Sequence, residues 1–298
     1  MSSSSVEISD LESLKGVAFD ETNRFAWPTF WLGVFTIIAI SIATTLAVVG
    51  VIPLWLGGVI NFCGFYTGYT VGHEIIHQNL TGRHRRLGWL NAVFGTLFFS
   101  VPFHSFTMHR FIHLRHHAYT NHPQKDPDAW INGRNVLELC FKLATHYLHY
   151  NYHAIAATRG APNRISFLLQ SMTEQIVPIL IASWLFFSGF ALEITLLWLA
   201  PAILIYPFLA FTLDWAPHHD LGDGTPVTTS RLLGAPSGLS GKIFSWLYLY
   251  QNYHLIHHLY PRVPFYRYAH IYNVGEQPLR KEGAKIYSGF DRRKAVTD

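Results

Sequence analysis

Cysteine and charge are both scarce in this sequence. Only two cysteines, Cys63 and Cys140, occur among 298 residues, and they form no CxxC motif. A cysteine-ligated cluster and a disulfide-stabilised secreted scaffold are therefore excluded. Charged residues make up 13% of the chain, well below the ~25% of an ordinary soluble domain. With 50% hydrophobic residues and a mean hydropathy of +0.18, the chain is neither disordered nor a solenoid of charged helices.

Basic residues are missing from two long stretches, between Arg24 and Arg83 and between Arg164 and Arg231. These stretches contain the long apolar runs of the sequence. Because about 20 apolar residues cross a bilayer core, we expect two hairpins of membrane spans. Glu193 should lie at the far turn of the second hairpin, with the bend in Phe-Phe-Ser-Gly-Phe. The expected spans are about 30–51, 53–71, 167–190 and 194–213.

All lysines and arginines lie in the N-terminal, middle and C-terminal regions, which an even number of spans puts on one side. The positive-inside rule makes that side the cytoplasm, so both termini are expected there. Segment 1–26 is polar and lacks the basic start and apolar core of a signal peptide. The pI of 9.0 then reflects cytoplasmic loops, and no basic cluster with interleaved aromatic residues indicates a nucleic-acid partner.

The expected fold is an all-α integral membrane protein with a cytoplasmic helical cap, formed by residues 1–298 as one domain. Two shorter apolar segments, 88–103 and 239–250, are expected as interfacial or half-inserted helices, because aromatic residues favour the membrane interface. The lipid bilayer is thus an expected partner of the chain.

Histidine is unusually frequent, with 18 residues, as many as aspartate and glutamate together. One group has the pattern H-x-x-x-H, and two groups have the pattern H-x-x-H-H. Positions i, i+3 and i+4 share a helix face, so each group presents its rings in one direction. A further pair, His218-His219, follows the fourth expected span. The three groups are His73/His77, His113/His116/His117 and His254/His257/His258.

All these histidines lie at the cytoplasmic ends of the expected spans, so the sequence predicts one metal centre there. The three groups plus one of His218 and His219 give more ligands than one zinc ion takes, and they suit two ions. Imidazole binds iron, zinc, copper and nickel. Iron is expected if the protein activates O2 beside an inert C–H bond.

Two other functions fit parts of the pattern. His73-Glu74-x-x-His77 is the zinc peptidase signature, with Glu74 as general base, but that function leaves most of the grouped histidines unexplained. A metal transporter would place its ligands near the membrane midplane, whereas these histidines lie at the cytoplasmic ends of the expected spans. Histidines outside the groups are expected to be structural or exposed, and His109, one turn before His113, is ambiguous. The others are His84, His104, His122, His146, His149, His153 and His270.

The three histidine groups, set between two hydrophobic hairpins, resemble those of the membrane fatty acid desaturase/hydroxylase superfamily. The local sequence around these groups is similar to that of bacterial β-carotene ring hydroxylases. The similar segments are Asp126-Pro-Asp128, Pro217-His218 and QNYHLIHHLYPRVPFYRY after Tyr250. The resemblance covers about residues 30–285. It implies a mushroom-shaped helical protein whose cytoplasmic cap holds two non-haem iron ions, with O2 as co-substrate.

The resemblance also implies a reaction and a ligand set. The expected reaction is hydroxylation of the β-ionone ring of β-carotene, with a fatty acyl desaturase or hydroxylase as the alternative, because the superfamily shares the histidine groups. His219 stands where the hydroxylases usually have arginine, which leaves the choice between His218 and His219 open. The implied ligands are His73, His77, His113, His116, His117, His218, His254, His257 and His258.

Supporting groups are expected around these ligands. Carboxylates hydrogen-bonded to ligating histidines orient them, although Asp126 and Asp128 equally suit a turn. The chain has no GxGxxG loop and no flavin motif, so a ferredoxin or other external reductase is the expected electron donor. The candidate carboxylates are Glu74, Asp126, Asp128, Asp214 and Asp220.

Overall fold

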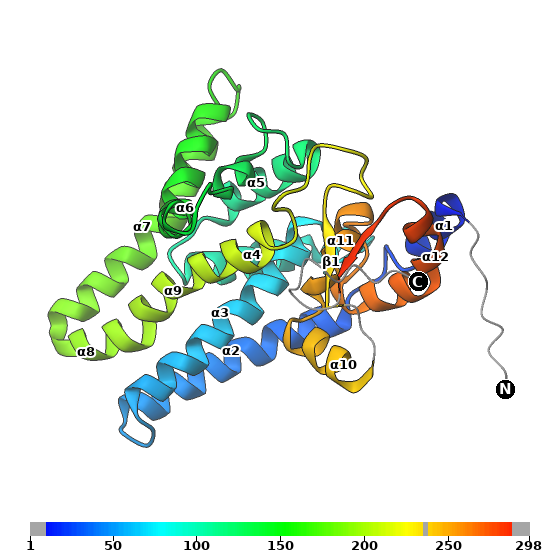
Figure 1. Ribbon diagram of the computed structural model, residues 1–298. Coiled ribbons are helices and arrows are strands. Elements are labelled where there is room, and N and C mark those ends of the chain that lie inside the picture. Colours follow the sequence, from blue (N-terminus) through cyan, green and yellow to red (C-terminus); the bar gives the residue numbers. More distant parts are fainter. Residues whose placement is uncertain (1–9, 235–237, 288–298) are drawn as a thin grey trace.

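The computed structural model is built almost entirely from helices (Figure 1). It describes residues 10–234 and 238–287, so part of the N-terminal segment 1–26 lies outside the described residues. The α-helices are α1 (Leu11–Asp20), α2 (Trp27–Val48), α3 (Leu54–Ile76), α4 (Gly88–Ser100), α5 (Phe106–Tyr119), α6 (Val136–Ala157), α7 (Arg164–Leu185), α8 (Ala191–Ile194), α9 (Ala200–Leu209), α10 (Gly238–Leu247), α11 (His254–Leu259) and α12 (Tyr268–Lys281).

Short helical segments of other types connect these helices. The π-type segments interrupt the stretch from α7 to the loop that carries His218, and the 3₁₀ turns lie in the cap. The π-type segments are η3 (Phe186–Phe190), η4 (Thr195–Leu199) and η5 (Ala210–Trp215), and the 3₁₀ turns are η1 (Arg85–Leu87), η2 (Pro127–Ile131), η6 (Gln251–Tyr253) and η7 (Phe265–Arg267).

The expectation of an all-α fold needs one correction. Strands β1 (Arg231–Leu233) and β2 (Lys285–Tyr287) form a two-stranded parallel sheet. The strands form because the chain after α12 returns beside the loop that follows His219, and buried backbone N–H and C=O groups need partners. The sheet ties the end of the described chain to the loop that carries His218.

The first hairpin is formed by α2 and α3, which lie side by side (Figure 1). Small residues allow the close approach: a Cβ on Gly64 would lie 2.5 Å from Cγ1 of Ile40. Asn61 of α3 donates hydrogen bonds to Thr44 Oγ1 of α2 at 3.0 Å and to the Leu197 carbonyl at 2.8 Å. Buried polar groups need such partners, so Asn61 fixes the first hairpin against the second.

The second hairpin runs from α7 through α8 to α9, with α8 at its tip (Figure 1). The bend falls in the Phe-Phe-Ser-Gly-Phe segment, where Gly189 has φ +106°, a conformation that favours glycine. Glu193 lies in α8, at the tip. The π-type turns on either side widen the helix locally, and such turns are frequent at functional sites.

Among the described residues, two helical stretches are long and apolar enough to cross a membrane, Trp27–Val48 and Arg164–Trp215. Their outer surfaces expose large apolar side chains, including Phe35, Trp184 and Phe187. Soluble monomers rarely expose large apolar patches, so these surfaces suit lipid. The two stretches do not include α3, and the four-span arrangement stays a prediction. The segments expected at the interface form α4 and α10.

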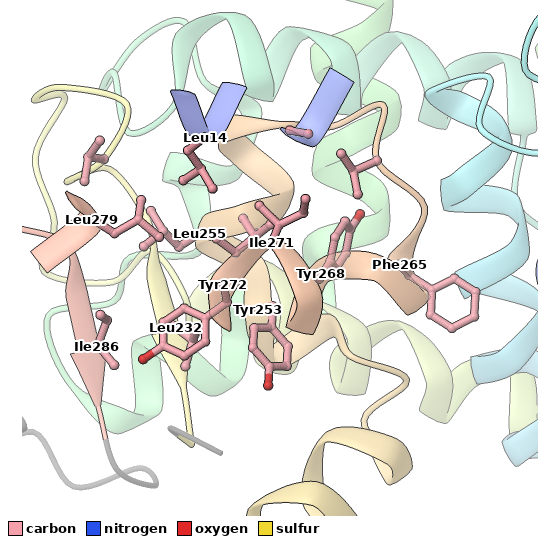
Figure 2. Packing of buried hydrophobic residues seen from close by; sticks show 14 residues of the cluster. Leu14, Leu232, Tyr253, Leu255, Phe265, Tyr268, Ile271, Tyr272, Leu279 and Ile286 are labelled. Carbon is pink, nitrogen blue, oxygen red and sulfur yellow. The ribbon is translucent and has the colours of Figure 1, made fainter. Parts of the chain in front are cut away.

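The cap has its own apolar core, formed by α1, α11, α12 and the two strands (Figure 2). Leu14 of α1, Leu255 of α11 and Ile271 of α12 are fully buried there. Full burial of one such side chain stabilises the fold by about 1.5–3 kcal/mol. This core holds α11, which carries the last histidine group, in a fixed position. Part of segment 1–26 therefore belongs to the cap as α1.

Candidate metal centre

The grouped histidines come from four parts of the fold. His73 lies in the last turn of α3 and His77 directly follows it, α5 carries the second group, and α11 carries the third. His218 lies in the turn after η5. The structure therefore brings together residues that are far apart in the sequence.

Helix α5 is anchored at its N-terminus by a carboxylate from another helix. The buried Glu174 of α7 accepts hydrogen bonds from Ser105 Oγ at 2.6 Å and from the backbone N–H of Thr107 at 2.9 Å. Ser105 Oγ in turn accepts from the backbone N–H of Met108 at 3.0 Å. These bonds satisfy N–H groups that a helix leaves free at its start, and the negative charge suits that end of the helix. Glu174 thus fixes the helix that carries the second histidine group.

Eight of the histidines form two clusters, each with ligand nitrogens within 4.8 Å of one another. We call them the first cluster and the second cluster. His117 lies between them: its Nε2 is 3.0 Å from His113 Nε2 of the first, and its ring stacks on His258 of the second with centroids 4.3 Å apart. The first cluster is His73, His77, His113 and His257, and the second is His116, His218, His254 and His258.

The nitrogen arrangement fits metal ions better than hydrogen bonds. His113 Nε2 lies 3.0, 2.9 and 3.0 Å from the Nε2 atoms of His73, His77 and His117. A ring nitrogen carries either one hydrogen or one lone pair, so it can make one good hydrogen bond among these three contacts. Metal–nitrogen bonds of about 2.0–2.1 Å put two ligands at a right angle ~2.9 Å apart. The donor set therefore fits a cation that several Nε2 lone pairs share.

The second cluster has the same spacing. His254 Nε2 lies 2.9 Å from His218 Nε2 and 3.0 Å from His258 Nε2, which lies 3.2 Å from His116 Nε2. Burial lowers the pKa of His254, His257 and His258 well below the usual value. These rings are therefore neutral near pH 7, in the form that binds metal.

His218, rather than His219, faces the second cluster. The Nδ1–H of His218 donates to the Thr229 carbonyl at 2.9 Å, which leaves the Nε2 lone pair directed toward His254. The ring of His219 instead stacks on Trp215, with centroids 4.0 Å apart and an interplanar angle of 5°. Its Nδ1 lies 3.4 Å from Asp220 Oδ1. The geometry thus separates the two candidates that the sequence left open.

Two carboxylates contact the outer nitrogen of His116. Its Nδ1 lies 2.9 Å from Asp126 Oδ1 and 3.1 Å from Asp128 Oδ2. Burial alone would lower the pKa of His116, but the two carboxylates outweigh burial and raise it to about 10. The same charges would stabilise a cation on Nε2, as carboxylates behind metal-bound histidines do. Asp126 also accepts from the backbone N–H of Asn121 at 2.6 Å, so it forms a turn as well.

The other candidate carboxylates have different surroundings. Glu74 is buried and accepts a hydrogen bond from Asn79 at 3.2 Å, and the Asn79 amide also donates to the Pro261 carbonyl at 3.0 Å. Asp214 lies 3.5 Å from His146, and the side chain of Asp220 is exposed beside His219. A structural role for Glu74, holding α3 against the cap, fits these contacts better than the general-base role of a peptidase.

Sequence analysis missed several supporting groups. The Tyr268 hydroxyl lies 2.9 Å from His257 Nδ1, and the Tyr150 hydroxyl donates to Asp128. The position of Tyr150 among the histidines of α6 was only a weak sign that it supports the centre. Only the PFYRY text after the last histidine group pointed toward Tyr268.

His104 and His146, expected to be structural or exposed, and His109, which was ambiguous, are all buried beside the centre. His109 stacks on His113 with centroids 6.1 Å apart and an interplanar angle of 8°, and it contacts His104. The ring of His146 lies 3.9 Å from that of Tyr150. The reason is packing: one face of α6 lies against α5 and covers the second histidine group. His149, on another face of α6, stacks on Trp130 with centroids 4.5 Å apart.

Comparison with known proteins agrees with this geometry. The model of the family described as fatty acid desaturase matches residues 43–289. A dihydrorhizobitoxine desaturase from Bradyrhizobium elkanii is 26% identical over 221 residues, which cover 66% of this chain and 60% of that relative. The match thus spans less than two thirds of the relative's length. The family match covers most of the chain and all the grouped histidines, and the chain therefore belongs to the fatty acid desaturase family.

Proposed function

We propose that this protein is a membrane di-iron oxygenase that hydroxylates a lipidic substrate, the β-ionone ring of β-carotene. The observation that carries the proposal is the pair of four-histidine clusters joined by His117. Two clusters suit two ions, and all-imidazole ligation suits iron among others. Bound iron would supply the capacity to activate O2 for attack on an inert C–H bond.

The chain's own residues would hold and orient these ions. The proposed ligands are the eight cluster histidines and His117. Thr229, Asp126 and Tyr268 contact the Nδ1 atoms of His218, His116 and His257. Such contacts fix the ring orientation and the tautomer of a ligating histidine. Burial of most ligands keeps bulk water away from the reacting carbon.

The substrate class rests on a cavity and on the sequence text. A largely apolar cavity of about 640 Å³ lies between α6, α7 and α9, on the side that suits lipid. Its volume is within the ~300–1,000 Å³ of ordinary ligand sites. It would let a hydrophobic molecule enter from the bilayer. The choice of a carotenoid rests on the resemblance of Asn252–Pro261 and of the PFYRY text to the ring hydroxylases.

A fatty acyl chain is the second candidate substrate. The family name and the desaturase relative favour it, and the apolar cavity suits an acyl chain equally. The acyl alternative keeps the same metal centre and the same ligands. It differs only in what fills the cavity and in whether the product gains a hydroxyl group or a double bond.

Electrons would come from a ferredoxin or another external reductase. A second cavity, of about 370 Å³ and with a lining that is about half polar, reaches His117 and His258 from the cap. These are the two half-exposed members of the proposed ligand set. We propose that this opening faces the cytoplasm, with both termini on the same side and with four spans in the membrane.

The test is expression in a host that makes β-carotene, together with a compatible ferredoxin and its reductase, followed by pigment and fatty acid analysis. We expect ring-hydroxylated pigments such as zeaxanthin, and none with the His257→Ala variant. Unchanged pigments beside new unsaturated or hydroxylated fatty acids would favour the acyl alternative. No new product of either class would contradict the proposal.

A further inference from the structure

Two cavities lie one behind the other on the membrane side of the metal centre. The outer cavity is the apolar one of about 640 Å³, and the inner cavity has a volume of about 30 Å³. Since one water needs ~10–15 Å³, the inner cavity has room for about two. Pro102, Tyr147 and Tyr206 line both cavities, so they form the wall between them.

Three histidines that the proposed ligand set does not include line the inner cavity: His104, His109 and His146. The first two, which are 4% and 7% exposed, contact each other. His104 Nε2 lies 3.0 Å from His109 Nδ1, so one of these nitrogens donates to the other. The remaining nitrogens, His104 Nδ1 and His109 Nε2, are buried and have no hydrogen-bond partner. A buried polar atom without a partner is costly, which indicates that a ligand completes the pair.

The chemistry of that ligand follows from the ring tautomers. If His104 donates through Nε2–H, its Nδ1 is an acceptor and His109 Nε2–H is a donor. If His109 donates through Nδ1–H, the roles are reversed: His104 Nδ1–H is the donor and His109 Nε2 the acceptor. Burial lowers the pKa of His104 to about 3, so its ring is neutral. In both tautomers one outer nitrogen is a donor and the other is an acceptor. They lie at opposite ends of the pair, so a hydroxyl group, which can donate or accept, can complete whichever one it reaches.

The pair also connects the wall of the outer cavity to the first cluster through a series of ring contacts. The ring of His104 meets those of Tyr147 and Tyr206 edge-on, with centroids 5.1 and 5.6 Å apart. At the other end, His109 stacks on His113 of the first cluster. A molecule whose end reaches the pair would thus have that end one ring away from a proposed ligand.

We propose that the His104–His109 pair binds the hydroxyl group at the end of a long hydrocarbon whose remainder lies in the outer cavity. The proposal rests on the proposed function, for which such a molecule is a hydroxylated product. The molecule reaches the pair when Tyr147 or Tyr206 turns aside. The Tyr147 hydroxyl donates to the Phe103 carbonyl at 2.9 Å, and the Tyr206 hydroxyl to the Pro102 carbonyl. The Tyr147 hydroxyl also contacts Gln175 Oε1, so opening the wall at Tyr147 breaks more contacts than opening it at Tyr206.

The test is a binding measurement on the full-length, metal-loaded protein in lipid nanodiscs, without O2 or electron donor, so that no turnover occurs. The first pair of ligands is β-carotene and its ring-hydroxylated derivative, whose binding is measured by the shift of their visible absorption. A second pair is an alkane and the primary alcohol of the same length, measured by competition. We expect the hydroxylated member to bind roughly fivefold more tightly, as one net hydrogen bond of about 1 kcal/mol would give.

Variants assign the preference to the pair. His104→Phe should abolish the preference for the hydroxyl while leaving the affinity for the hydrocarbon within about twofold. His104→Gln should retain a preference, because its amide also offers a donor and an acceptor. His270→Phe, which changes an exposed histidine beside Glu21 in the cap, should behave as the wild type does.

The outcomes separate this inference from the proposed function. A preference for the hydroxylated pigment that is lost in His104→Phe supports the inference. A preference seen only with the alcohol and alkane supports the hydroxyl site and contradicts the carotenoid substrate. Equal affinities within both pairs in the wild type, or a preference unchanged in His104→Phe, would overturn the inference and mean that the pair binds water only.

Discussion

The Nε2 atom of His117 lies 2.9 Å from the Nε2 atom of His257, although 140 residues separate the two in the sequence. His117 also stacks on His258 of the second cluster. One side chain of α5 therefore touches both clusters, and both contacts are with α11. The two clusters form one centre, and the loss of a ring where they meet should affect the whole of it.

His257→Ala should abolish activity and lower the metal content. His257 belongs to the first cluster, and its removal takes away a ligand nitrogen and a neighbour of His117. His149→Ala is the matched control, because His149 stacks on Trp130 outside both clusters. Product formation and metal analysis on both purified variants check this. Normal product levels from both variants would rule out the ligand assignment.

Tyr268→Phe should weaken metal binding while leaving the fold intact. The change removes the hydroxyl that lies 2.9 Å from His257 Nδ1, and losing such a contact costs roughly 10- to 100-fold in metal affinity or activity. Tyr272→Phe is the control, one turn later on α12, where the ring packs near Tyr253. Competition with a chelator measures the affinity. Equal metal affinity in the two variants would show that Tyr268 does not orient His257.

Acid should destabilise the protein partly through His104. Burial lowers the folded-state pKa of His104 to about 3, from its usual value of 6.5. As the pH falls, His104 therefore binds a proton in the unfolded state before it does so in the folded state. Its contribution to the free energy of unfolding is complete above pH ~6.5 and decreases by ~1.4 kcal/mol per pH unit below it. Between pH 7.5 and 4.5, the free energy of unfolding should decline less steeply with falling pH for both His104→Phe and His104→Gln than for the wild type. Slopes equal to that of the wild type would contradict the burial of this ring.

The two cysteines report on topology. Both are exposed on the surface of the fold, but Cys63 lies within the expected span 53–71 and Cys140 in the expected cytoplasmic region. A membrane-impermeant thiol reagent should label Cys140 only after cells are opened, and should leave Cys63 unlabelled until detergent is added. Cys63→Ser and Cys140→Ser identify the labelled site. Labelling of Cys63 in intact membranes would argue against that span.

The regular features of this protein could be predicted from its sequence. Stretches without lysine or arginine indicated the two helical hairpins, and the i, i+3, i+4 spacing of histidines indicated rings that point the same way. Both signals are local, so they survive without knowledge of the tertiary structure. The Phe-Phe-Ser-Gly-Phe segment likewise predicted the bend, which the structure has at Gly189.

Features that depend on distant contacts could not be predicted. The choice between His218 and His219 depends on the Thr229 carbonyl, which fixes one ring, and on Trp215, which holds the other. His104 looked like an isolated histidine and His109 was ambiguous, because only packing puts their rings around a cavity. The strands form because two remote segments meet, and neither segment carries a strand pattern of its own.

The most direct test of the central claim is the metal content of the purified, full-length protein. Two histidine clusters joined by His117 predict about two iron ions per chain, and His257→Ala should hold fewer. Elemental analysis against protein concentration gives the number. About two irons per chain would support the di-iron centre, whereas one zinc ion and no iron would contradict it and favour a peptidase-like site at His73 and His77.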